Sequence, residues 1–250
     1  MKIIFQFLYF LLGITSGFSQ DNIKMNRSLN PGEQSIITIA AITAKGDLIK
    51  LKPALNEGLD AGLTISQIKE ILVHTYAYCG FPRSIRGLQT FMEVLDERKA
   101  KGIVDEAGKE ASPVNQESGQ NAWGTTKEQS KYERGKKVLG ELTKMPQEKP
   151  SSGYGVFAPV IDRFLKEHLF ADIFERDVLT YAQREWVTIS VISAIGDAEP
   201  MLRSHLTICL NVGITPAQLM EFPGIIRSVV GRKEAKAAKN VLNEVLDNRK

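Results

Sequence analysis

The chain has 250 residues, of which 43% are hydrophobic, enough to give one large domain or two small ones a real core. Its formal net charge is only +3 and no block of it is strongly basic, which argues against nucleic acid as the main partner.

The first 20 residues have the pattern of a secretory signal. Lys2 gives a short positive start, and a nearly unbroken apolar run from Ile3 to Ile14 follows it. Small residues then stand at the positions that a signal peptidase reads, so we expect cleavage after Ser19 or Gln20. A retained anchor helix is the less favoured alternative, because about 12 apolar residues are too few to span a bilayer. We therefore expect a periplasmic or secreted protein with no membrane span after signal removal.

An internal repeat organises the rest of the chain. The segment from Leu29 to Gly62 matches the segment from Leu179 to Gly213 with one inserted residue, and the match continues to Gly80 and Gly231. Each copy shows apolar residues at helical spacing, glycines just past helix ends and capping residues before the next helix. No segment shows convincing strand alternation. The pattern predicts an all-α fold made of two tandem helical-bundle repeats.

A stretch rich in Gly, Ser, Asn, Glu and Lys separates the copies and predicts a linker, much of it mobile. We place the first repeat at residues 26–98, the linker at 99–129 and the second repeat at 130–250. The second repeat has two extra leading helices, predicted from Tyr132 to Leu142 and from Phe157 to Phe174.

Glu185 and His205 form the best acid/base pair in the sequence. They lie on consecutive predicted helices joined by the turn Gly196-Asp197, where Asp197 is expected to cap the second helix. In an antiparallel hairpin their depths differ by roughly 4–5 Å, about one turn. A carboxylate beside an imidazole can move protons near neutral pH. The alternative is a surface glutamate with a hydrogen-bonded, partly buried histidine.

A second candidate region surrounds Gly80, where one helix is predicted to end. Cys79 stands there with Arg83 one turn on, and positive neighbours lower the pKa of a thiol. The alternative for Cys79 is a small core residue. Arg83 has the planar donor fork that holds a substrate carboxylate, although it could equally be an exposed charge that opens a helix. We expect Arg83, His74 and Tyr78 to be the substrate-binding residues.

Metal and nucleotide motifs are missing from the sequence. The three histidines are far apart without metal-ligand spacing, and there is no Gly-rich phosphate loop, so we predict no metal and no cofactor. His168 is expected to be a satisfied structural histidine. Cys79 and Cys209 could form one bond in an oxidising compartment, but their different places in the repeats disfavour a symmetric bridge.

Several of these stretches together resemble the carboxymuconolactone decarboxylase-like family. The similar segments in the second copy are Leu179–Ile189, Leu202–Leu206 and Asn211–Pro216, preceded by the aromatic segment His168–Phe174. Those in the first copy are Glu70–Leu72 and Tyr78–Pro82. The resemblance covers about Asn26 to Arg98 and Tyr132 to Asp247.

The resemblance implies an all-α fold shared with alkylhydroperoxidase-like proteins, which assemble into rings, so we expect a homo-oligomer such as a trimer. It also implies two chemistries, the cofactor-free decarboxylation of a lactone acid and thiol-based peroxide reduction. The peroxidase branch relies on a Cys-x-x-Cys followed by a histidine, which neither copy has. Glu185 and His205 match the family's candidate acid/base positions.

The two copies depart from the family pattern in different places. Ser35 and Ala54 of the first copy stand where the second has its Glu–His pair, and Val230 of the second stands where the first has Cys79. This divergence is consistent with two arrangements. In one, both copies contribute residues to a single site; in the other, one copy is active and the second has a purely structural role.

Three hypotheses follow for the function. The leading one is a lyase or isomerase-type enzyme for a small molecule, in which Glu185 and His205 move protons and Arg83 holds a carboxylate. The second is a peroxidase, or alkyl hydroperoxide reductase, in which Cys79 attacks the peroxide as a thiolate. The third is a non-catalytic exported binding or assembly module that reuses the fold.

Overall fold

The computed structural model describes residues 28–112, 118–120, 126–128, 130–148, 150 and 153–249. Its helices are α2 (Pro31–Lys45), α3 (Leu48–Asp60), α4 (Ile65–Ala100), α5 (Lys131–Thr143), α6 (Tyr154–Phe157), α7 (Pro159–Phe164), the π-helix η1 (Leu165–Phe174), α8 (Tyr181–Ile195), α9 (Glu199–Asn211), α10 (Pro216–Val229) and α11 (Arg232–Asp247). The predicted signal and its cleavage site lie outside the described residues. Among the helices described, none combines the length and apolarity that crossing a bilayer requires.

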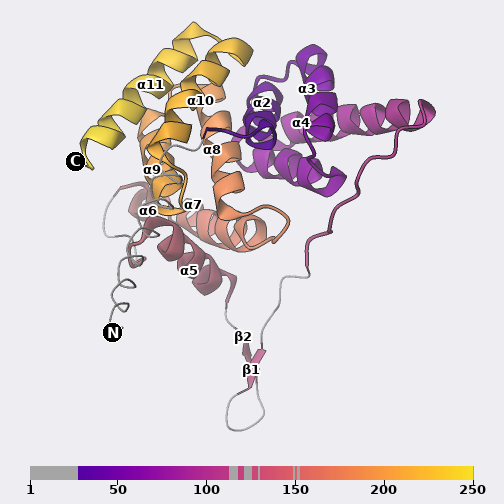
Figure 1. The fold of residues 1–250 in the computed structure, drawn as a ribbon. Helices are drawn as coiled ribbons and strands as arrows, with labels where there is room; N and C mark the ends of the chain where they lie inside the picture. The colour runs from indigo at the N-terminus through magenta and orange to yellow at the C-terminus, as the bar shows by residue number, and fades with distance from the viewer. Residues whose placement is uncertain are drawn as a thin grey trace, which may run out of the picture.

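The protein is an all-helical pair of tandem repeats, as the internal match predicts (Figure 1). Helices α2 to α4 form the first repeat, and α8 to α11 form the core of the second. Helix α4 bends at Gly80, where φ is 79°, so its two halves correspond to α10 and α11, which are separated at Gly231. The predicted helix break at Gly80 is confirmed, because this residue is non-helical between the two helical halves of α4.

The two repeats share one hydrophobic core. The lead helices α2 and α8 pack against each other, α2 also contacts α10, and α8 also contacts α4. Each lead helix thus contacts the third helix of the other repeat, and fully buried residues such as Ile37 and Val191 belong to a single cluster. Side chains from the first repeat can therefore reach the second.

Local capping follows the sequence in most places. Thr64 and Thr215 each form the predicted capping box with the glutamine three residues on. Asp47 accepts a hydrogen bond from the Lys50 N–H and caps α3. The prediction that Asp197 caps α9 is wrong. Asp197 has a left-handed φ of 53°, and the residue before α9 is Ala198, which makes no side-chain cap.

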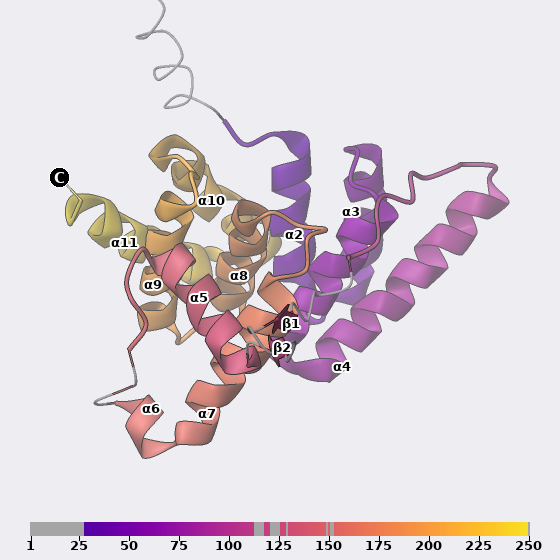
Figure 2. The same ribbon diagram turned by 90° about the horizontal axis from the view of Figure 1, so that it is seen from below.

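The leading helices of the second repeat form a small core of their own. Helix α5 packs against η1, and Leu142 and Phe170 are buried between them. The segment predicted as one helix from Phe157 to Phe174 is instead the end of α6, then α7 and η1. Figure 2 shows α6 and α7 as separate helices, and Ala158 between them is non-helical. Pro159 explains that break, because the residue before a proline avoids the helical region.

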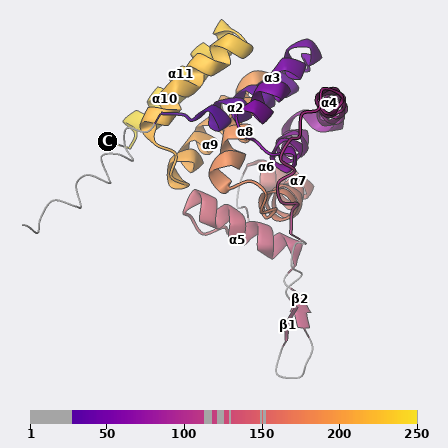
Figure 3. The ribbon, with the colours of Figure 1, turned by 45° about the vertical axis from the view of Figure 1, so that its right-hand side comes forward.

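The linker contains the strands β1 (Ser118–Gln120) and β2 (Thr126–Glu128), which form an antiparallel pair (Figure 3). We expected no strand; the structure has this one pair of three-residue strands in its described part, beside an otherwise helical architecture. The start of the linker is bound rather than loose. Arg98 donates two hydrogen bonds of 3.0 Å to Asp105, and the Ile65 N–H donates to the Glu106 carbonyl at 2.9 Å.

Candidate functional site

The structure brings Glu185 of α8 and His205 of α9 into direct contact. Nδ1 of His205 lies 2.9 Å from Oε2 of Glu185. The glutamate side chain is 0% exposed and the histidine side chain is 13% exposed. The alternative of a surface glutamate is therefore excluded, and the pair is a buried couple with one accessible edge on the imidazole.

The partner of each atom fixes what the couple can do. An ionised carboxylate only accepts hydrogen bonds, so in the neutral imidazole Nδ1 carries the proton and Nε2 keeps its lone pair. In the described part of the chain, Nε2 of His205 and Oε1 of Glu185 have no hydrogen-bond partner. An unpaired buried acceptor costs about 1–3 kcal/mol. Nε2 of His205, on the partly exposed residue of the couple, is therefore the atom that can pair with a ligand, whereas Oε1 of Glu185 is enclosed by protein.

A chain of hydrogen bonds alternates between the two repeats: it runs from Arg184 to His74, then to Thr188 and finally to Tyr78. Nη1 of Arg184 lies 3.2 Å from Nδ1 of His74, whose Nε2 lies 2.9 Å from Oγ1 of Thr188. Arginine can only donate, so Nδ1 of His74 accepts and its Nε2–H donates to the threonine. Thr188 in turn donates to the Tyr78 hydroxyl at 3.2 Å. The Tyr78 proton is left without an acceptor among the described residues, so it can be donated to a ligand.

Burial sets the protonation state of this donor chain. It lowers the pKa of His74 well below its usual value, and Arg184 and His205 add to that effect, so His74 stays neutral. Burial raises the pKa of Tyr78 far above its usual value, and the nearby Glu185 carboxylate reinforces it. Tyr78 therefore remains a phenol, and its ring lies edge-on to His205 with 6.1 Å between centroids.

An ion pair between the repeats holds the start of this chain. Arg184 is fully buried, and its Nη2 donates to Oε2 of Glu70 at 3.2 Å and to the Arg176 carbonyl at 2.6 Å. Nε of Arg176 also donates to Glu70, at 2.9 Å. Sequence reasoning did not identify Arg184 or Thr188. The sequence feature that could have pointed to Arg184 is the charged pair Arg184-Glu185 in the first turns of an otherwise apolar helix.

The structure does not bring Cys79 or Arg83 into contact with the couple. The Cys79 thiol donates to the Thr75 carbonyl at 3.0 Å, and burial raises its pKa to about 11, opposed by that bond and by Arg83. The exposed Arg83 guanidinium lies over Gly46 at the end of α2. His74 and Tyr78 are thus the two predicted binding residues that reach the site.

The remaining predicted residues have structural surroundings. His168 bonds to the hydroxyl of Tyr76 and, at 3.1 Å, to Asp172, as expected of a satisfied histidine. Cys209 is buried one turn beyond His205, and burial raises its pKa well above the usual value. Both cysteines are free.

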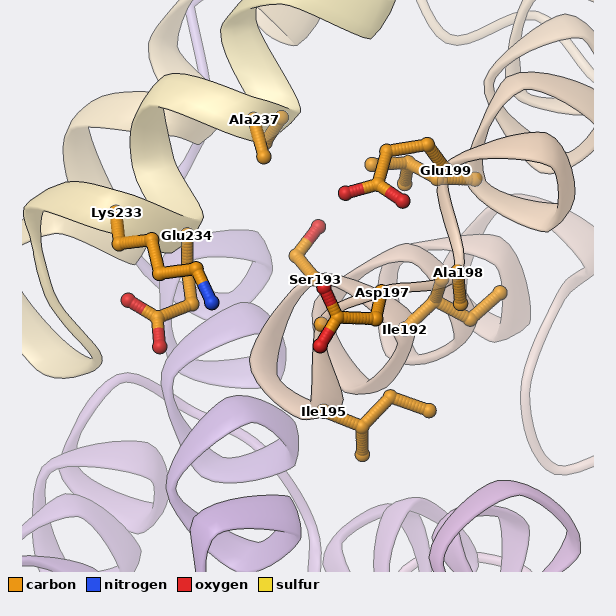
Figure 4. Close-up of a pocket in the computed structure, with 12 residues that line it drawn as sticks. Ile192, Ser193, Ile195, Asp197, Ala198, Glu199, Lys233, Glu234 and Ala237 are labelled. Atoms are coloured by element: carbon orange, nitrogen blue, oxygen red, sulfur yellow. The ribbon is translucent and has the colours of Figure 1, made fainter.

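Two cavities in the described part of the chain are lined by residues other than Glu185 and His205. One of about 60 Å³ lies at the end of α8 (Figure 4), and one of about 640 Å³ lies beside α6 and α7. The exposed part of the couple belongs to His205, whose side chain is 13% exposed against 0% for Glu185.

Two helical repeats that share one core, with a buried Glu–His couple where they meet, define the class of protein. The sequence model of the carboxymuconolactone decarboxylase family matches residues 13–91 and 159–244. The chain belongs to this family, and the two matched regions are its tandem copies. The first region begins inside the predicted signal. A search of curated proteins found no match.

Proposed function

We propose that this protein is a cofactor-free acid/base enzyme that decarboxylates or isomerises a small carboxylated or lactone substrate. The observation that carries the proposal is the 2.9 Å contact between His205 and the fully buried carboxylate of Glu185. That contact orients the imidazole and leaves its Nε2 free to exchange a proton with a ligand. Membership of the family supports the same kind of chemistry.

The donor chain gives the reaction its second component. In a decarboxylation the bond to the carboxylate carbon breaks, CO2 leaves, and the electron pair passes into the conjugated lactone carbonyl as an enolate. In this proposal the Tyr78 O–H donates to that oxygen as its charge develops, which is supported by its lack of an acceptor among the described residues. For this step His205 first takes a proton from solvent on Nε2; as an imidazolium it delivers that proton to carbon and returns to the neutral form. In an isomerisation His205 removes a proton from one carbon and returns it to another. Neither step uses Arg83, whose carboxylate-binding role stays a prediction.

The direct test is turnover of a panel of small lactone carboxylic acids, followed by CO2 release and ultraviolet absorbance. We expect His205→Gln to lower kcat/KM by about 10²–10⁴, the usual contribution of a general acid or base. Tyr78→Phe should lower kcat by about 10²-fold, because it removes one donor to the oxyanion. His168→Gln is the matched control, because that residue lies outside the couple, and it should leave turnover unchanged.

Two results would contradict the proposal. One is a His205→Gln variant that turns over every accepted acid as fast as the parent. The other is a folded parent that turns over no member of the panel, which would favour the non-catalytic binding module.

The peroxidase alternative has less support from the geometry. A thiol with a pKa of about 11 carries little thiolate at neutral pH, and the thiolate is the nucleophile. Peroxide treatment followed by mass measurement separates the two functions. Rapid oxygen addition at Cys79 would favour the peroxidase.

Export and ring assembly rest on the sequence pattern and the family resemblance. We propose that the mature chain begins at Gln20 or Asp21 and forms a homo-oligomer. N-terminal sequencing of the exported protein and its mass in solution test these two points.

A further inference from the structure

The end of the lead helix is occupied differently in the two repeats. In the first repeat the Arg83 guanidinium covers Gly46 so closely that a Cβ added there would lie 1.4 Å from Nη1. The carboxyl end of a helix is the negative end of its dipole and favours a cation. The first repeat therefore places one of its own cations at the end of α2.

In the second repeat the corresponding place is open. Gly196 is the equivalent of Gly46, and a Cβ added at Gly196 would meet nothing within 4 Å. The repeat register puts Glu234 where the first repeat has Arg83. A cavity of about 60 Å³ lies there, at the end of α8 (Figure 4). The side chain that fills this place in one copy has thus become a carboxylate in the other.

A buried hydroxyl without a partner lines this cavity. Ser193 is 5% exposed, and its Oγ has no hydrogen bond within the described structure. The equivalent Thr43 donates to the Ile39 carbonyl at 2.7 Å, so its hydroxyl is satisfied within its own helix. Figure 4 shows the Ser193 hydroxyl directed into the space between α11 and the start of α9. A donor from a ligand would relieve the cost of this unpaired group.

The charges around the cavity favour a cation. Asp197, Glu199 and Glu234 line it together with a single cation, Lys233. Glu234 makes a long ion pair of 3.8 Å with Lys45, and no ion pair within 4 Å joins Asp197, Glu199 or Lys233 to any described residue. The described carboxylates do not form a group that could hold a metal ion. A cation that brings its own N–H donors fits this arrangement better.

We propose that this cavity binds the primary ammonium group of a small alkylamine. The ammonium would donate to the Ser193 hydroxyl and to the surrounding carboxylates, at the negative end of α8. The apolar side chains of Ile192, Leu202 and Ala238 would contact the alkyl carbons. The volume is about that of two water molecules, so it holds the head of such a ligand while the remainder extends outward. The proposal does not depend on the function of the Glu185–His205 couple.

The test is an NMR and calorimetric titration of the protein with ethylammonium and 1,4-diaminobutane. Tetramethylammonium, potassium and magnesium are titrated separately at the same ionic strength. We expect saturable binding of the two amines, with amide shifts confined to residues 196–199 and 233–238. Binding of tetramethylammonium or potassium with equal affinity, or no saturable binding of either amine, would overturn the proposal.

Variants locate the binding within the cavity. Ser193→Ala and Asp197→Asn should each weaken amine binding by about tenfold or more, since each removes a hydrogen bond to a charged group. Asparagine tolerates the left-handed φ of residue 197, so the second variant keeps the backbone. Glu234→Arg should abolish binding, because it recreates the arginine of the first repeat.

The first repeat and the cavity rim supply the matched controls. Asp47→Asn makes the same change at the equivalent position, where asparagine caps α3 equally well, and should leave binding unchanged. Lys233→Gln should leave binding unchanged or tighten it. A requirement for Lys233, or equal affinity in the Ser193, Asp197 and Glu234 variants, would show that the cavity is not an ammonium site.

Discussion

One carboxylate oxygen of Glu185 holds His205, and the other faces no partner among the described residues. At the scale of single residues this is the main chemical feature of the protein. Counting helical rise from the turn at Gly196 puts the two side chains about one turn apart in depth, so that they could share a cavity. The same count cannot predict that Thr188 and Arg184 connect the site to His74, because those contacts depend on how one repeat packs against the other.

Cys79 likewise shows that a property set by packing cannot be predicted from neighbouring residues in the sequence. Sequence neighbours suggest that Arg83 activates Cys79, but burial outweighs the arginine and raises the thiol pKa to about 11. Burial depends on the complete fold, so local sequence gives the wrong sign for this shift.

We predict that alkylation of Cys79 by iodoacetamide is slow at neutral pH. Since only the thiolate reacts, a raised pKa means that the rate should increase about tenfold per pH unit toward pH 11. In the unfolded chain the same thiol should titrate near its usual value of about 8.5. Site-resolved mass spectrometry measures the rate, and Cys79→Ser separates it from Cys209. A rate that levels off below about pH 8 would contradict the assigned environment.

At the scale of elements, the caps and glycine ends could be predicted because their signals lie within a few residues. The identity of η1 as a π-helix could not, and neither could the left-handed conformation of Asp197, which lines the second-repeat cavity. Helix α5 shows the same dependence on packing. A Cβ added at Gly135 would lie 1.8 Å from the Lys166 carbonyl oxygen, so only glycine allows α5 and η1 to approach this closely.

We predict that Gly135→Ala destabilises the protein by about 2–3 kcal/mol, because backbone rather than a flexible side chain must move. Gly140→Ala is the control on the same helix, where the nearest atom would be 3.3 Å away. That variant should change the free energy of unfolding by less than about 1 kcal/mol, since alanine also favours the helix. Urea unfolding compares the two. Equal effects would show that the close approach of α5 and η1 is not needed.

At the scale of the whole molecule, the repeat register predicts two copies and the all-helical class, which the structure confirms. It does not predict that the lead helices pack together or that both copies supply one site. The repeats have diverged at their junction. Glu70 is buried against Arg184. Its equivalent Glu221 is exposed and, among the described residues, accepts a single 3.4 Å bond from the Leu29 N–H.

We predict that Glu70→Ala lowers the free energy of unfolding by about 3–5 kcal/mol, because it leaves the buried Arg184 without its carboxylate. Glu221→Ala, the same change in the other repeat, should cost about 1 kcal/mol or less. Denaturant unfolding of the two variants measures the difference. Similar decreases in the free energy of unfolding for the two variants would mean that the Glu70–Arg184 ion pair does not stabilise the contact between the repeats.

The central claim is that both copies build one site in which His205 presents an unprotonated Nε2. Long-range ¹H–¹⁵N NMR of the imidazole nitrogens tests it without a substrate, at a pH where the ring is neutral. We predict a proton on Nδ1 of His205 and the opposite tautomer, with the proton on Nε2, for His74. A His205 ring protonated on Nε2, or one that exchanges freely between its two tautomers, would contradict the claim.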